Sequence, residues 1–233
     1  MGGMIRKTTH LDSVDSLDEW IDRVCEADPL PELPQEPEPE NGPPLSREEV
    51  EAARTKLSLW QQPPAFIRTT EELCRRCTSE DWFNRPHLKF LHDAYVLAEF
   101  VRLTLVDQVR LATASEQWPD GQVRAGDKTH NIEVTSTHGG RRLGEEYRGV
   151  QAATLDPVKN WIARAESIPH HLNEAINAKA EKNYGSACWL VVYLNINEYD
   201  IRQAEIERVI ATIKARYAAA FEAISVLWKQ KLY

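Results

Sequence analysis

The sequence predicts a mixed α/β protein in which helices cover a central sheet. Residues 87–106, "HLKFLHDAYVLAEFVRLTLV", repeat apolar side chains at helical spacing, and short β-branched pieces follow them. Residues 188–196, "CWLVVYLNI", form an almost continuous apolar run of strand length, which is typical of a buried central strand. The order of helix, neighbouring strands, long helix, buried strand, helix and strand favours layers of helices on a sheet.

Composition bounds the class of protein. The chain has 233 residues, 42% of them hydrophobic and 27% charged, which is ordinary for a globular protein. Its net charge of −8 argues against a protein that coats nucleic acid by bulk charge. Many of the acidic residues precede residue 52, so a local cationic groove elsewhere on the protein is compatible with this net charge. No run of eighteen apolar residues and no signal-peptide core occurs, so we expect a cytoplasmic protein with no membrane partner.

The chain divides into three parts. Residues 1–28 are predicted to form an N-terminal helical segment, because apolar residues recur at helical steps from Val14 to Val24. Residues 29–44 contain seven prolines and form a Pro/Glu-rich linker. Residues 45–233 are the globular body, with a helical extension before its core. The tethered first helix is expected to dock either on this body or on a partner protein.

Within the body, each element has its own local signal. Ser46 followed by Glu49 is a capping-box pattern for a first helix. The remaining expected elements are a helix over 69–77, a helix over 87–106, strands over 108–113, 121–126 and 130–137, a helix over 157–183 interrupted by Pro169, a strand over 188–196, a helix over 202–218 and a strand over 221–228.

Two carboxylates stand out among strand-forming residues. Asp120 follows a proline, and Glu133 lies between Ile132 and Val134, with twelve residues between the two acids. If a hairpin over 121–128 pairs the two segments, the acids converge on one point. Mg²⁺ prefers such oxygen ligands and keeps waters for a phosphate substrate. The ordinary alternatives are a turn acid in Pro-Asp-Gly and a solvent-facing strand position for Glu133.

The pattern P-D-x12-E-x-T over 119–135 resembles the signature of the PD-(D/E)xK nuclease superfamily. By the order of elements, the resemblance covers about residues 86–228. It implies a restriction endonuclease-like fold, a mixed central sheet flanked by helices, here with extra N-terminal helices. It also implies that Asp120 and Glu133 bind Mg²⁺ or Mn²⁺, and that Glu99 joins them as the acid of the preceding helix.

The sequence departs from that signature at the lysine position, which holds Thr135. Some members of the superfamily carry the lysine on the following helix, where this chain has Lys179 and Lys182. Lys179 follows the apolar Ile176 by one helical turn and therefore borders the packed face. Lys179 and Lys182 are the candidate catalytic lysines, and a catalytically inactive relative is the alternative if neither reaches the acids.

The segment "THGGRRLGEEYRG" at 137–149 directly follows the acid-bearing strand. Arg141, Arg142 and Arg148 can grip phosphates in a bidentate manner, and His138 is a candidate proton carrier or phosphate contact. The alternative is a charged loop whose residues pair with one another. The partner expected is nucleic acid, DNA before RNA, and a homodimer is a further assembly to test.

For the other reactive side chains the sequence favours ordinary structural or surface roles. Cys74 and Cys77 read as two thiols one helical turn apart in a reducing compartment. His170, His171 and Glu174 invite a zinc site, but only His171 and Glu174 are expected to share a helix face, so surface histidines are favoured. Four tryptophans beside apolar neighbours are expected in the core: Trp118, Trp161, Trp189 and Trp228.

Two functions follow from these residues. The leading hypothesis is a metal-dependent nuclease, in particular a DNA endonuclease. The alternative is a catalytically inactive nuclease-like fold that acts as a nucleic-acid or protein binding module.

Overall fold

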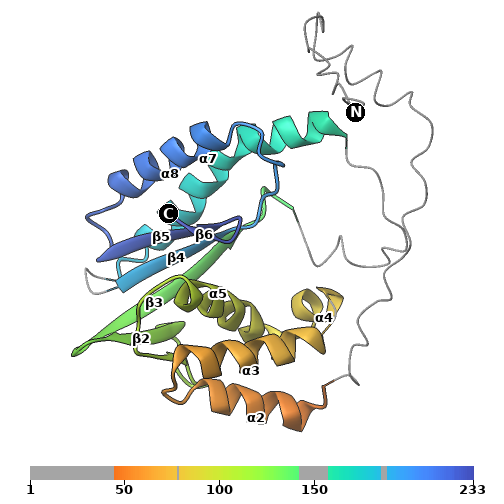
Figure 1. Cartoon of the computed structure of the whole chain (residues 1–233), viewed down its shortest axis with the longest axis vertical. Helices are drawn as coiled ribbons and strands as arrows, with labels where there is room; N and C mark the ends of the chain where they lie inside the picture. The colour runs from red at the N-terminus through yellow and green to blue at the C-terminus, as the bar shows by residue number, and fades with distance from the viewer. Residues whose placement is uncertain (1–44, 78, 142–156, 185–187) are drawn as a thin grey trace, which may run out of the picture. The chain divides into compact units, whose positions relative to one another are not determined.

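A computed structural model describes residues 45–77, 79–141, 157–184 and 188–233. The predicted N-terminal helix and the linker lie outside the described residues. The described part is a mixed α/β protein with a six-stranded sheet, as the sequence predicts (Figure 1). Among these residues no helix is both long and apolar enough to cross a bilayer.

The strands lie in the sheet in the order in which they occur in the chain, β1-β2-β3-β4-β5-β6. The first three pair antiparallel, β3, β4 and β5 run parallel, and β6 returns antiparallel. Their bounds are β1 Gln108–Leu111, β2 Gly121–Ala125, β3 Lys128–Thr137, β4 Cys188–Leu194, β5 Ala223–Trp228 and β6 Lys231–Leu232. Each strand that the sequence predicts is present, whereas the two-residue β6 was not predicted.

The helices lie on both faces of this sheet (Figure 1). Their bounds are α2 Arg47–Leu57, α3 Pro63–Arg75, α4 Ser79–Asn84, the 3₁₀ turn η1 Pro86–Leu88, α5 Phe90–Arg102, α7 Val158–Ala180 and α8 Gln203–Arg216. The predicted capping box of Ser46 and Glu49 begins α2. Two expectations need correction, because α3 already begins at Pro63, where a proline fits the first turn, and α7 continues through Pro169 without interruption.

Alternation along the strands separates two cores. Ile132 and Val134 of β3 face one cluster of buried residues, which is shared with α3 and α5. Leu190 and Val192 of β4 face the other cluster, together with buried residues of α7 and α8. Five of the seven β4 residues are buried, so the prediction of a central strand is confirmed. Helices above and below therefore hold β3 and β4 in the middle of the layers.

The strand β3 is longer than its neighbour β2. The β2–β3 pairing ends where Gly121 lies opposite Ile132, whereas β3 continues along β4 to Thr137. Among the described residues, positions 133–137 of β3 thus have β4 on one edge and no strand on the other. The candidate site lies at the start of this unpaired edge.

Candidate active site

Asp120 lies directly before β2, beside the part of β3 that carries Glu133. Gly121 and Ile132 are the last pair of the β2–β3 ladder, so Asp120 and Glu133 are the next residues beyond this pair on the two chain segments. The backbone N–H of Val134 donates to Oδ2 of Asp120 at 2.8 Å, which fixes the carboxylate beside β3. Glu133 is 4% exposed, so the solvent-facing interpretation of this strand position is wrong. The structure brings together the two acids that the sequence singled out.

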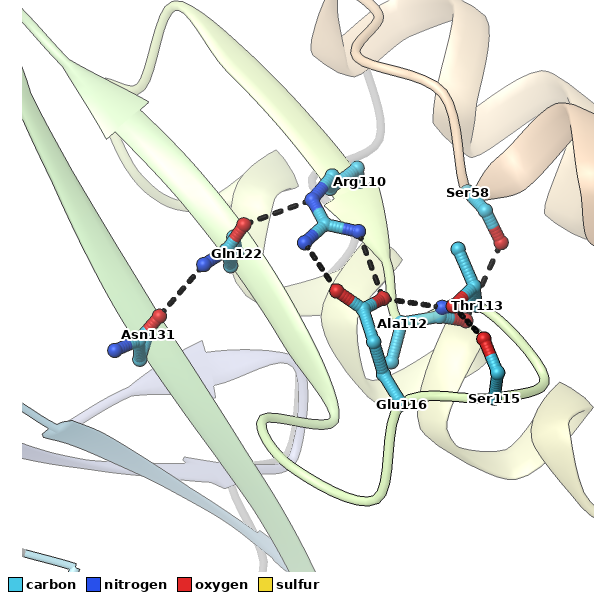
Figure 2. Close-up of polar contacts among 8 residues, drawn as sticks. All are labelled: Ser58, Arg110, Ala112, Thr113, Ser115, Glu116, Gln122 and Asn131. Atoms are coloured by element: carbon cyan, nitrogen blue, oxygen red, sulfur yellow. Dashed lines mark hydrogen bonds and ion pairs between the residues drawn. The ribbon is translucent and has the colours of Figure 1, made fainter.

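A polar network holds the β1–β2 connection that ends at Asp120 (Figure 2). Arg110 of β1 donates to both oxygens of Glu116, at 3.0 and 2.8 Å, and Glu116 also accepts the Thr113 N–H at 2.7 Å. The same guanidinium donates to Gln122 of β2 at 2.8 Å, and Gln122 donates to Asn131 of β3 at 2.7 Å. These bonds anchor the connection to β1, β2 and β3, and Asp120 is the last residue of this connection.

Gly121, directly after Asp120, allows β2 to approach its neighbours closely. A Cβ at this position would lie 2.6 Å from Cδ2 of Leu97 and 3.0 Å from the carbonyl oxygen of Arg110. The N–H of Ala112 donates to the carbonyl of Asp120 at 2.9 Å and closes the connection at its base. The glycine of Pro-Asp-Gly therefore serves packing between α5 and β1, rather than only the turn chemistry that the sequence suggests.

Lys179 of α7 reaches Glu133 and forms an ion pair with its Oε1. The hydroxyl of Tyr184 donates to the same oxygen at 2.7 Å. The ammonium group beside Glu133 thus comes from α7, at one of the two lysine positions that the sequence predicts. The other candidate, Lys182, is exposed, and its ammonium lies 5.9 Å from the centre of the Tyr184 ring.

A third acid, Asp93 of α5, completes the electrostatic environment of the site. Burial, together with the negative charges of Asp93 and Glu133, raises the pKa of Asp120 to about 6. The hydrogen bond from Val134 and the positive charge of Lys179 lower that pKa, but by less than burial and the acids raise it. Burial and the hydrogen bond to Glu133 also raise the pKa of Tyr184, which stays a neutral donor at physiological pH.

Glu99, the helix acid that the resemblance implies, has other neighbours. Its carboxylate lies 3.4 Å from Nε of Arg102, and it lines a cavity of about 290 Å³ with Tyr95 and Tyr193. Asp93 is the residue of α5 whose charge acts on Asp120. The sequence did not single out Asp93, and only knowledge of which side of α5 faces the end of β2 would have found it.

The donor set suits a hard divalent cation. Asp93, Asp120 and Glu133 offer carboxylate oxygens, which Mg²⁺ and Mn²⁺ favour as ligands. The raised pKa of Asp120 means that its charge is not fully balanced by the side chains around it. A bound cation would relieve this repulsion. Among the described residues, however, these three acids are not a group whose ligand oxygens all lie within 4.8 Å of one another, so they fit the predicted metal by charge and donor type alone.

His138 and Arg141 follow the site along the end of β3. Nε2 of His138 lies 3.1 Å from Oγ of Ser136, and Nδ1 lies 3.2 Å from Nδ2 of Asn195. The ring is therefore held between two polar side chains, at the side of the sheet where His92 also lies. Arg141 is exposed, four residues after the end of β3. Arg142 and Arg148 lie outside the described residues.

Trp118 differs from its prediction as a core residue. Its side chain is 36% exposed and stacks on the ring of Tyr184, with centroids 5.9 Å apart and planes at 11°. The hydrophobicity of tryptophan predicts burial on average, but here one ring face packs while the rest meets solvent. Trp228 is 1% exposed, as predicted, and Trp161 and Trp189 are partly buried.

The remaining reactive residues lie apart from these acids. Cys74 and Cys77 are free, and burial raises the pKa of Cys74 to about 12, which keeps it a thiol at neutral pH. His170 and His171 both approach Glu174, at 3.2 and 3.6 Å. The expectation that only His171 shares a face with Glu174 is wrong, since residues four apart are also neighbours on a helix.

No protein-family model matches the chain, and comparisons with curated proteins and with solved structures find no match. The class is therefore defined by the fold and the site themselves. It is a mixed α/β protein in which Asp120, directly before β2, is surrounded by the charges of Glu133 of β3, Asp93 of α5 and Lys179 of α7.

Proposed function

We propose that the chain is a metal-dependent nuclease of the PD-(D/E)xK type, which hydrolyses phosphodiester bonds and uses DNA as substrate. The observation that carries this proposal is the convergence of Asp120, directly before β2, with Glu133 of β3 and Lys179 of α7. The sequence pattern predicts all three as site residues. A fortuitous match of the short pattern gives no reason for a distant lysine to contact Glu133.

The order of elements supports the same proposal. The chain runs from α5 through three antiparallel strands to α7 and then to the buried β4, which lies parallel to β3. The resemblance implies this succession of helix, strands, helix and buried strand. The lysine on the second helix then stands in for the lysine that Thr135 replaces. Fold and site thus favour one interpretation at two independent levels.

In this proposal Asp120 and Glu133, with Asp93, hold a Mg²⁺ or Mn²⁺ ion. When bound, the ion supplies Lewis-acid chemistry, polarising the phosphate and lowering the pKa of a water. Lys179 places its ammonium beside Glu133, where it stabilises negative charge that develops on the phosphate oxygens. Tyr184 donates to Glu133 and orients its carboxylate, and the Val134 N–H does the same for Asp120.

Side chains around the acids suit a nucleic-acid strand. Trp118 and Tyr184 form a partly exposed pair of aromatic rings beside the acids, on which a base can stack. Lys182 adds a positive charge over the Tyr184 ring, and Arg141 adds one near the end of β3. These local cations offset the acidic net charge of −8 at the place where a phosphate backbone would lie.

Cleavage of defined substrates tests the proposal. The purified full-length chain is incubated with supercoiled plasmid and with end-labelled duplex, single-stranded DNA and RNA, in Mg²⁺ or Mn²⁺. We expect cleavage that Asp120→Asn abolishes and that Glu116→Gln leaves intact, since Glu116 is an acid of the same connection that pairs with Arg110. Cleavage that persists unchanged in a purified Asp120→Asn sample would overturn the proposal.

A binding module without catalysis is the second candidate. It is favoured by one observation, namely that Oε1 of Glu133 has both Lys179 and Tyr184 as partners. Calorimetry with Mn²⁺ separates the two candidates. A nuclease should bind the ion and lose binding in Asp120→Asn and Glu133→Gln, whereas a pure binding module should retain affinity for nucleic acid without binding the ion.

A further inference from the structure

A second group of ligand-type side chains lies on α7, apart from the acids at β2. Nε2 of His170 is 3.2 Å from Oε2 of Glu174, and Nδ1 of His171 is 3.6 Å from the same oxygen. The three ligand atoms all lie within 4.8 Å of one another. Along α7 the group precedes Lys179 by roughly 8 to 14 Å, given the rise of about 1.5 Å per residue. We refer to it as the His-His-Glu cluster.

We propose that the His-His-Glu cluster binds a divalent transition-metal ion, with Zn²⁺ as its best-fitting ligand. Zinc is held at about 2.0 to 2.1 Å by imidazole nitrogen and at about 2.0 to 2.2 Å by carboxylate oxygen. In a tetrahedral site those bonds separate neighbouring ligand atoms by roughly 3.4 Å. The two nitrogen–oxygen distances in the cluster, 3.2 and 3.6 Å, lie on either side of that value.

The chemistry of the donors distinguishes this cluster from the acids at β2. Two imidazoles and one carboxylate favour zinc, cobalt, nickel or copper over magnesium, which prefers oxygen ligands alone. Three protein ligands leave one position of a tetrahedral ion open to water or another ligand. The inference is independent of the proposed nuclease function, because it uses none of the residues assigned to the substrate or to Mg²⁺.

The local packing limits the movement of one ligand. His171 has 21% of its side chain exposed, and a Cβ at Gly140 would lie 3.5 Å from its Cε1. Gly140 has a φ of +75°, a backbone conformation that favours glycine. His171 is therefore seated between α7 and the segment that leaves β3, while His170 and Glu174, at 68% and 60%, stay accessible from solvent. A bound ion would fix these side chains beside Gly140.

Zinc titration of untagged full-length protein tests the proposal. The background is Cys74→Ser/Cys77→Ser, so that this partly exposed pair of thiols does not compete, combined with Asp120→Asn to alter the acidic site. Calorimetry with Zn²⁺ should show one saturable equivalent, and Co²⁺ should give the visible absorption of a tetrahedral complex. Both signals should survive millimolar Mg²⁺.

The variants decide whether the ion lies at the cluster. His170→Ala and His171→Ala should each weaken zinc binding at least tenfold, because two ligands hold the ion less well than three. His87→Ala is the matched control, an exposed histidine of η1 whose replacement should leave the affinity unchanged. The proposal is overturned if no saturable binding occurs, or if His170→Ala and His171→Ala bind zinc like the parent protein.

Discussion

Two acids in the connection between β1 and β2 have opposite electrostatic surroundings. Glu116 accepts hydrogen bonds from both ends of the Arg110 guanidinium, and these bonds lower the pKa of its carboxyl group to about 2. Asp120 is buried near Asp93 and Glu133, and these surroundings raise its pKa to about 6. The same short segment therefore carries one acid whose ionisation favours folding and another whose ionisation opposes it.

This is the difference that we expect between a structural acid and a functional one. An acid paired with arginine anchors a loop, and its pKa falls because the folded state stabilises the charge. Acids gathered without enough positive charge cost stability, and such groups concentrate at sites that bind cations or perform catalysis. Glu116 anchors the connection through Arg110, whereas Asp120 is held by the N–H groups of Val134 and Ala112.

The largest expected effect is on cleavage. Asp120→Asn keeps an oxygen for the Val134 N–H but removes the charge that holds the metal, so cleavage should fall at least about a thousandfold. Glu116→Gln should retain cleavage within a few-fold when measured below its melting temperature. Initial rates on labelled duplex at saturating Mg²⁺ provide the measurement. Equal losses of cleavage in Asp120→Asn and Glu116→Gln would show that the two acids do not differ in their importance for catalysis.

The second effect concerns Lys179 in the last turn of α7 and Lys182 just after this helix. Lys179→Ala should reduce the rate about a hundredfold to a thousandfold, as expected for loss of a group that stabilises developing charge. Lys182→Ala removes an exposed ammonium and should change the rate by less than about fivefold. Single-turnover kinetics with saturating enzyme separate this chemical effect from substrate binding. A larger loss in Lys182→Ala would assign the catalytic ammonium to the other lysine.

The third effect is a gain in stability from loss of the functional acid. In metal-free protein the surroundings of Asp120 raise its pKa from 3.8 to about 6. Between pH 3.8 and about pH 6 the folded state therefore binds this proton more tightly than the unfolded state does. Its contribution to stability therefore falls as the pH rises from about 4 to about 6. In EDTA, Asp120→Asn should match the parent near pH 4 and exceed it by about 1 to 3 kcal/mol at pH 7.

Metal should offset most or all of that difference. With Mn²⁺ at about a hundred times its Kd, binding stabilises the parent by about 2.7 kcal/mol, and Asp120→Asn should gain almost none of this. Urea unfolding monitored by tryptophan fluorescence measures both conditions with the same samples. A variant that is less stable than the parent in EDTA at pH 7 would mean that the Asp120 carboxylate stabilises the fold.

Much of the fold could be predicted from the sequence, because its signals are local. The apolar run of β4, the alternation in β1 to β3 and the capping box at Ser46 each depend on neighbouring residues only. The start of α3 at Pro63 was missed because its first turn lacks apolar periodicity. The short β6, Lys231–Leu232, depends on pairing with β5 and has no pattern of its own.

The candidate site was predictable in part, for a related reason. Asp120, Glu133 and Lys179 could be found because a short motif and the border of a helix face carry them. Asp93 could not be found in this way, because helical periodicity defines the sides of α5 but not which side faces the start of β2. The exposure of Trp118 was equally hidden, because it depends on a stacking partner, Tyr184, far along the chain. Contacts between distant segments are the part that sequence patterns do not encode.

The smallest expected effect is on the structural acid itself. Glu116→Gln should destabilise the protein by about 1 kcal/mol at pH 7, since it removes a charge-assisted, bidentate pair that is only partly buried. The pKa of Glu116 is lowered from 4.5 to about 2, so its contribution is complete above pH 4.5 and is lost as the pH falls toward 2. The difference between parent and variant in urea unfolding should therefore shrink below pH 4.5. This trend is opposite in sign to the one for Asp120→Asn, and a difference of constant size across the pH range would show that the Arg110–Glu116 charge pair is not its source.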